Sequence, residues 1–173
     1  MNSLLDKGII EKLYEASQAG VKIELIVRGI CVLIPGIPGV SDNITVRSIV
    51  GRFLEHSRIF WFRNGGREEL YISSADWMPR NLNDRVELMV PIEDPEIKRR
   101  LKQMVDIELS DNQKAHIMQA DGTWLKTISA ENQLCAQEYF QKIAEKRDAE
   151  DEMTLAQKLE PYTPVLGHGD GSD

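Results

Sequence analysis

The sequence has only two cysteines among its 173 residues and no long uninterrupted apolar run. Cys31 and Cys135 lie far apart and match no metal-binding spacing, so we expect two small core residues rather than a disulfide or a zinc site. No run of about 18 apolar residues could span a bilayer, and no signal peptide opens the chain. We therefore expect a cytoplasmic protein without an integral membrane segment. The sequence leaves open a peripheral association with a membrane as part of a complex.

The two common glycine-rich phosphate-binding motifs are also missing. No Walker loop with its Gly-Lys pair is present, and no GxGxxG fingerprint follows a predicted strand. Any nucleotide or polyphosphate would therefore have to be held by side chains. We expect no nucleic acid partner.

The net charge of −7 is unevenly distributed along the chain. Seven acidic side chains and one lysine lie between Asp148 and Asp173, and they account for −6 of the total. The rest of the chain is close to neutral, so it can hold a local basic cluster that the total conceals. We expect one domain over residues 1–148, followed by an acidic, disordered tail over residues 149–173.

Apolar periodicity predicts an α/β domain with a mixed β-sheet flanked by helices. The first helix is expected over residues 3–19, with Ser3 as its N-cap. Over residues 85–90, alternation turns Val86, Leu88 and Val90 toward the core. The other predicted elements are strands over residues 21–27, 57–62, 69–73 and 85–90, and helices over residues 96–109 and 129–147.

The stretch from Arg52 to Asn83 contains a predicted pair of strands with polar side chains at one end. His56 and Arg58 are two residues apart, so their side chains share one face of a strand. A single histidine is more often structural or exposed than functional. Together, however, an imidazole and a guanidinium make a poor core and a good oxyanion site, because arginine offers a forked, permanently charged set of donors.

The second strand of the pair ends in Ser73, Ser74 and Asp76. The hydroxyl groups can donate to a phosphate, and the Asp76 carboxylate can orient the imidazole of His56. A histidine opposite a phosphoryl group can act as nucleophile, acid or electrostatic stabiliser.

Arginines near predicted strand ends supply a second indication. Any one of these arginines is as easily a solvated surface charge as a ligand contact. As a group, however, arginines favour the recognition of phosphate more than lysines would, because a guanidinium can make bidentate contacts. The group consists of Arg28, Arg47, Arg52, Arg58, Arg80 and Arg85.

Three segments of the chain resemble a known family: ELIVRGICVL, GVSDNITVRSIVGRFLEHSRIFWF and YISSADWMPRNLNDRVELMVPI. They are similar to the final catalytic domain of bacterial type-1 polyphosphate kinase, which has a phospholipase-D-like fold. The resemblance runs from about residue 3 to the end of the predicted helix near Arg147. It implies that this chain is the second of two phospholipase-D-like domains that face one another and share an active site.

The resemblance also implies an activity. Such enzymes reversibly transfer the terminal phosphate of ATP to inorganic polyphosphate, with magnesium and a phosphohistidine intermediate. The phosphorylated histidine and the magnesium-binding residues belong to the preceding domain, so no metal site is expected in this chain. Matched to the family, Arg28 is an arginine that binds the ATP phosphates. His56 is a second histidine of the nucleotide site, which assists transfer as acid, base or stabiliser.

Supporting roles follow from residue type and position. Arg58, Ser74 and Asp76 are expected to hold the histidine or the phosphate, and Arg47 and Arg80 to line the path of the polyphosphate. The expected partners are ATP, polyphosphate and the preceding catalytic domain of the same enzyme, and the sequence leaves a homo-oligomer open. The isolated chain is expected to be inactive, because phosphoryl transfer depends on positioning groups that lie outside it.

Two alternatives stay open. The domain can be a binding module for phosphate, polyphosphate or nucleotide without catalysis. It can also be a phospholipase-D-type phosphodiesterase that dimerises to pair two His56 sites. The signature of that activity is degraded, however: Arg58 stands in the place of a lysine, Arg63 in that of an aspartate, and residues 73–76 in that of Gly-Ser-x-Asn.

Overall fold

The structure is a computed structural model that describes residues 1–158, with side chains described to residue 148. The described residues divide into two units, Met1–Gln137 and a second that begins at Glu138. The helices are α1 (Lys7–Gln18), α2 (Pro79–Asn83), α3 (Pro95–Leu109) and α4 (Ala136–Lys158), with a short 3-10 turn at Asn64–Gly66. The strands are β1 (Ile23–Ile26), β2 (Ile44–Ile49), β3 (Ile59–Phe62), β4 (Glu69–Ser73), β5 (Met89–Pro91), β6 (Ala115–Met118) and β7 (Trp124–Lys126).

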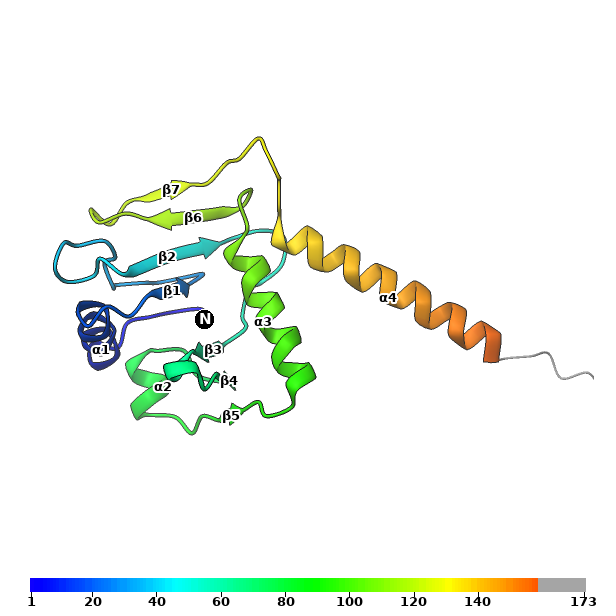
Figure 1. Cartoon of the computed structure of the whole chain (residues 1–173), viewed down its shortest axis with the longest axis horizontal. Helices are drawn as coiled ribbons and strands as arrows, with labels where there is room; N and C mark the ends of the chain where they lie inside the picture. Colours follow the sequence, from blue (N-terminus) through cyan, green and yellow to red (C-terminus); the bar gives the residue numbers. More distant parts are fainter. Residues whose placement is uncertain (159–173) are drawn as a thin grey trace, which may run out of the picture. The chain divides into compact units, whose positions relative to one another are not determined.

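The strands of the first unit form two sheets (Figure 1). The first has the order β1-β2-β6-β7, with β1 parallel to β2 and the other neighbours antiparallel. The second has the order β3-β4-β5 and is antiparallel throughout. The predicted α/β class with a mixed sheet flanked by helices is confirmed, although the strands divide between two sheets rather than one.

The N-terminal segment, residues 1–5, lies between these two sheets. Leu4 forms a parallel bridge with Cys31 on one side and with Trp77 on the other. Leu4 is fully buried, in a core cluster that also contains Ile10 of α1 and Val46 of β2. The segment therefore connects the end of β1 to the chain that follows β4.

The predicted start of the first helix was wrong. Helix α1 begins at Lys7, and its N-cap is Asp6, whose carboxylate accepts a hydrogen bond from the backbone N–H of Ile9 at 2.9 Å. Ser3 is buried in the extended segment instead. The pairing of Leu4 with Cys31 and Trp77 keeps the segment around Ser3 extended, so the helix starts after Asp6, whose residue type is also favoured at N-caps.

The predicted inward face of residues 85–90 was also wrong. Strand β5 covers only Met89–Pro91, and the side chains of Val86 and Leu88 are 100% and 70% exposed. Val90 is 45% exposed. Alternation predicts which side chains share a face of a strand, but it does not require that another element covers that face.

The last predicted helix differs at both ends. It begins at Ala136 rather than residue 129 and continues to Lys158. Residues 149–158, which were expected to be disordered, are therefore helical, and residues 159–173 lie outside the described part of the chain. The first compact unit ends at Gln137, and the division into a domain over residues 1–148 and a disordered tail stays a prediction. No helix found among the described residues has both the length and the apolar character needed to cross a membrane.

Candidate phosphate site

A chain of hydrogen bonds connects the end of β1 to the start of β3. Arg28 follows β1, and its Nε and Nη2 donate to Oδ1 of Asn2 at 2.9 and 2.7 Å. The backbone N–H of Asn2 donates to Oδ1 of Asp76 at 2.8 Å. Asp76 accepts two further bonds from Arg58, which contacts the ring of His56. Four of the predicted site residues are thus connected through one residue, Asn2, that the sequence analysis missed.

The pair formed by Arg58 and Asp76 is the buried centre of this chain. Their side chains are 13% and 5% exposed, and Nε and Nη2 of Arg58 each lie 3.1 Å from a different carboxylate oxygen. Burial alone would raise the pKa of Asp76. The bonds from Arg58 and from the backbone N–H groups of Asn2 and Ser3 outweigh it, so the pKa is lowered. The carboxylate therefore stays charged and holds the guanidinium in one orientation.

His56 is exposed and lies against the guanidinium of Arg58. Its Nδ1 is 2.9 Å from Nη1 and its Nε2 is 3.1 Å from Nη2. A guanidinium has only donors, so a ring nitrogen bonded to it must accept. The carboxylate of Asp76 reaches the imidazole through Arg58 rather than directly. Arg58 is therefore suited to position His56, with its own charge already balanced.

Arg28 differs from Arg58 because its charge is not balanced by a carboxylate. None of the ion pairs among the side chains of residues 1–148 includes Arg28. Its backbone is fixed, since the Oγ of Ser48 donates to the carbonyl of Arg28 at 2.9 Å. The next residue, Gly29, approaches the segment so closely that a Cβ there would lie 3.0 Å from the carbonyl oxygen of Asn2. A charged fork on a rigid backbone is well suited to an oxyanion.

The serines of the predicted site do not join this chain of hydrogen bonds. The Oγ of Ser73 donates to the carbonyl of Leu88 at 2.9 Å. The Oγ of Ser74 accepts from the N–H of Leu88 at 3.0 Å and donates to Glu87. Glu87 also accepts from Asn81 of α2. Both hydroxyl groups thus fix the segment before β5 to the end of β4 and the residue that follows it.

The two arginines expected along a polyphosphate path lie on other elements. Arg80 is exposed on the short helix α2. Arg47 is in β2, in register with Ile26 of β1, and is half-buried. Burial lowers the pKa of Arg47, and the charges of Glu24 and Asp111 partly offset this. Their proposed roles remain untested predictions.

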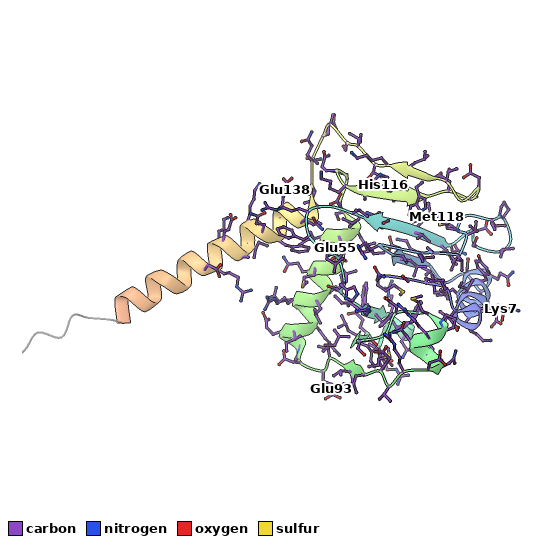
Figure 2. The ribbon with its side chains drawn as sticks, turned by 180° about the vertical axis from the view of Figure 1, so that it is seen from behind. Lys7, Glu55, Glu93, His116, Met118 and Glu138 are labelled. Carbon is purple, nitrogen blue, oxygen red and sulfur yellow. The ribbon has the colours of Figure 1, made fainter. Side chains whose placement is uncertain are left out.

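The loop that precedes His56 is held by a residue far along the chain. Gln137 is 5% exposed, and its amide bonds both backbone groups of Phe53: Oε1 accepts from the N–H at 3.1 Å, and Nε2 donates to the carbonyl at 2.8 Å. Nε2 also donates to Oε1 of Glu55 at 2.7 Å (Glu55 is labelled in Figure 2). A Cβ at Gly51 would overlap the Gln137 amide. No spacing in the sequence points to this contact across more than 80 residues.

This contact leads to a double-mutant prediction. Gly51→Ala should lower the free energy of unfolding by about 1–3 kcal/mol, because the methyl group displaces a buried amide. Gln137→Ala should cost about 1–3 kcal/mol, because the backbone groups of Phe53 lose their partner. Together they should cost clearly less than the sum, since the overlapping amide is absent. Urea denaturation of the four chains measures this, and additivity within about 0.5 kcal/mol would contradict the contact.

Glu108 of α3 is a half-buried carboxyl whose charge interacts with that of Glu55. Burial, with a further contribution from Glu55, raises the pKa of Glu108 to about 7, against an opposing contribution from the Met1 amine. Between about pH 4.5 and 7, the folded chain keeps a proton on Glu108 that the unfolded chain releases. Raising the pH through this window should therefore destabilise the fold, by up to ~3 kcal/mol.

The test is urea denaturation between pH 4.5 and 8. Glu108→Gln should remove most of the slope and stabilise the chain at pH 8, whereas Glu93→Gln, at an exposed position labelled in Figure 2, should leave the slope unchanged. An unchanged slope in Glu108→Gln would show that another group titrates.

The residues of this site do not fit a magnesium ion. Among the described residues, no group of three or more His, Cys, Asp or Glu side chains could hold a metal. The one buried carboxylate of the site, Asp76, already accepts N–H donors from Arg58 and from the backbone of Asn2 and Ser3. Its oxygens are therefore occupied by donors and are not available as metal ligands.

Comparison with known proteins identifies the family. The family model described as "Polyphosphate kinase C-terminal domain 2" matches residues 1–137. A polyphosphate kinase of Staphylococcus haemolyticus is 54% identical over 157 residues, covering 91% of this chain and 22% of that protein. One of Pseudomonas aeruginosa is 56% identical over 133 residues, covering 77% of this chain and 19% of that protein.

A solved structure supports the same assignment. The crystal structure of polyphosphate kinase from Porphyromonas gingivalis superposes with a TM-score of 0.81 and 44% identity, covering 87% of this chain and 23% of that one. The chain thus spans about a fifth of the length of the relatives that it matches. The resemblance found in the sequence is confirmed, and the chain belongs to the polyphosphate kinase C-terminal domain 2 family.

Proposed function

We propose that this domain binds the nucleotide phosphates and assists their reversible transfer to polyphosphate within a longer polyphosphate kinase. One observation carries the proposal: the chain of hydrogen bonds from Arg28 through Asn2, Asp76 and Arg58 to His56. It supports the proposal because it ends on one side in a guanidinium that has no carboxylate partner among residues 1–148, and on the other in an exposed imidazole. The positive charge of Arg28 and the imidazole of His56, which can exchange protons, are thus held by one network of hydrogen bonds.

Arg28 is the proposed phosphate ligand. A guanidinium has five N–H donors, and two of the bonds go to the single oxygen Oδ1 of Asn2. The remaining N–H groups are available to phosphate oxygens. Asn2 adds no negative charge, so it orients the fork without weakening its attraction for an anion. Such preorganised donors stabilise the charge that spreads over the oxygens of a phosphoryl group in transfer.

His56 is the proposed acid, base or stabiliser of the transfer. Arg58 holds the imidazole in place, and Asp76 balances the charge of Arg58. An incoming phosphate would compete with Arg58 for the ring nitrogens, so the imidazole must turn toward the phosphate to act on it. The phosphorylated histidine and the magnesium ion expected from the family belong to the preceding catalytic domain.

Supporting residues are proposed at a distance from this network. Ser74 donates to Glu87, which also accepts from Asn81 of α2, so Ser74 would help to fix the helix that carries Arg80. Arg47 and Arg80 are proposed to line the path of the polyphosphate. ATP as a substrate implies a cytoplasmic protein, and the domain's partners would be ATP, polyphosphate and the preceding domain.

A chimera tests the function in this chain's own numbering. Residues 1–137 would replace the matched region of the Staphylococcus haemolyticus enzyme, and polyphosphate synthesis from ATP would be measured. His56→Ala should lower kcat by about 10²–10⁴-fold, as expected for loss of a general acid or base. His116→Ala is the matched control, because His116 lies on β6 and bonds the backbone of Lys114 (Figure 2).

The isolated chain should incorporate no phosphate, because half of the positioning groups are absent. A folded chimera that binds polyphosphate but does not transfer would favour a binding module instead. Phosphate incorporation by the isolated chain would contradict the need for the preceding domain.

A further inference from the structure

A cavity of about 920 Å³ separates the two sheets of the first unit. Residues 21–26 line one side and residues 59–66 line the other, so β1 and β3 both border it. Among the described strands, β1 and β3 are each the edge of their own sheet. Helix α1 and helix α3 also contribute to the lining, through Leu13 and Val105 among others. The cavity thus lies in the plane of the sheets, between helices.

The walls of this cavity expose two kinds of group to solvent: backbone hydrogen-bonding groups and apolar side chains. Edge strands present backbone N–H and C=O groups that require hydrogen-bond partners. Apolar side chains on the walls are also open to solvent, since Val21 is 50% exposed and Phe62 is 45% exposed. A small apolar molecule would cover the side chains but leave the backbone groups unpaired.

A backbone ladder already enters the cavity at Met1. The N–H of Gly29 donates to the carbonyl of Asn2 at 2.8 Å, and the N–H of Arg28 donates to that of Met1 at 3.2 Å. The amine of Met1 donates to the carbonyl of Ile26 at 2.9 Å. With the parallel bridge of Leu4, these bonds form a parallel ladder that leads onto β1. Met1 itself lines the cavity, and Figure 1 marks the N-terminus between β1 and β3.

We propose that this cavity is the slot of one β-strand, filled by the segment that joins onto Met1 in a longer polyphosphate kinase chain. The strand would pair parallel to β1 and run along β3, which joins the two sheets into one. The length of the relatives supports this occupant, because the chain covers only 22% of the Staphylococcus haemolyticus enzyme. The edge of residues 21–26 accommodates roughly six residues of strand at ~3.3 Å per residue.

The lining also indicates the chemistry of this strand. A strand covered by helices on both faces reads as a nearly continuous apolar run. Toward α1 it would meet Leu13 and Ala16, and toward α3 it would meet Val105 and Leu109. Glu108 is the one polar side chain that α3 contributes to the lining. We therefore expect one side chain of the strand to carry a hydrogen-bond donor that faces Glu108. Affinity would come from backbone bonds to both edges, as in β-strand addition.

The test extends the 173-residue chain at its N-terminus. One version carries the roughly ten residues that precede the match in the Staphylococcus haemolyticus enzyme, a length that exceeds the predicted strand. The control carries a Gly-Ser extension of equal length. Backbone hydrogen exchange is followed at residues 22–26 and 59–62. The natural extension should slow exchange at both edges by at least about tenfold relative to the control. If the extended chain aggregates, the same segment is added as a free peptide to the 173-residue chain.

Three results would overturn the proposal. Equal exchange rates in the two versions would show that the segment does not fill the cavity. Slowing at β1 alone would show that the strand does not join the two sheets. Hydrogen exchange could also slow in both versions, including the control, as the protein concentration rises and a dimer forms. That result would identify a second copy of the chain as the occupant.

Discussion

Replacing Asp76 with alanine is expected to lower the free energy of unfolding by about 3–5 kcal/mol, the usual cost of breaking a buried ion pair on one side. The carboxylate is 5% exposed and accepts from Arg58 and from the backbone N–H of Asn2. Its removal leaves the guanidinium of Arg58, 13% exposed, without a partner for its charge. The same change removes one of the contacts that hold the segment before α1 to the chain after β4, while the bridge between Leu4 and Trp77 stays in place.

The pH dependence identifies the carboxylate as the cause. The pKa of Asp76 is lowered by folding, so its contribution is complete above the unfolded pKa near 3.8 and is lost as the pH falls through the folded value. The difference between the original chain and Asp76→Ala should thus be constant above about pH 5 and shrink below about pH 4. Urea denaturation across this range measures it. Glu93→Ala, at an exposed position, should change stability by less than about 0.5 kcal/mol.

A loss below about 1 kcal/mol for Asp76→Ala would place the pair among solvated surface ion pairs. Such a result would contradict the view that Asp76 anchors the site. A large difference that persists unchanged at pH 3 would assign the loss to packing rather than to the carboxylate charge.

Arg28→Ala in the chimeric enzyme is expected to lower kcat/KM for ATP by about 10²–10³-fold, the typical effect of removing one donor to a developing oxyanion. The reason is that Arg28 is a fixed guanidinium whose charge no carboxylate balances within residues 1–148. Arg28→Lys keeps the charge but loses the fork, so it should recover only part of the activity. Steady-state kinetics in both directions of the reaction measure these effects.

Arg67→Ala is the matched control, because it removes one exposed positive charge at the turn between β3 and β4. It should leave kcat/KM within about twofold, since an exposed charge far from the site is largely screened by salt. Equal losses in Arg28→Ala and Arg67→Ala would reduce the role of Arg28 to general attraction of a polyanion. An active Arg28→Ala enzyme would remove this residue from the site.

Much of the site could be predicted from the sequence because its chemistry is concentrated in short motifs. The spacing of His56 and Arg58 predicted that both lie on one strand face; in the structure both precede β3, which begins at Ile59, but their side chains still meet. The turn before β4 returns the chain so that Asp76 contacts Arg58. The structure brings these three residues together with Arg28. Strand pairing of this kind is local in sequence, so alternation and turn residues are sufficient to predict it.

The rest depends on contacts that leave no periodic pattern. Asn2 lies in an extended segment that looks like the start of a helix, and Gln137 reaches Phe53 from the other end of the domain. The exposure of Val86 has a related cause, because residues 85–90 alternate as a strand does, whereas strand β5 forms only over Met89–Pro91. Each of these features is decided by which segments meet in space, which single-residue preferences do not encode.

The measurement that tests the central claim most directly is a titration of the isotope-labelled 173-residue chain with inorganic tripolyphosphate, followed by nuclear magnetic resonance. The side-chain Nε–H signal of Arg28 and the ring signals of His56 report on the two ends of the network, and the signal of Arg67 is the internal control. We expect the Arg28 and His56 signals to shift along one common binding curve, with Arg67 unchanged. Binding that moves other arginines while Arg28 and His56 stay unchanged, or no binding at all, would contradict the claim that this domain holds a preformed phosphate site.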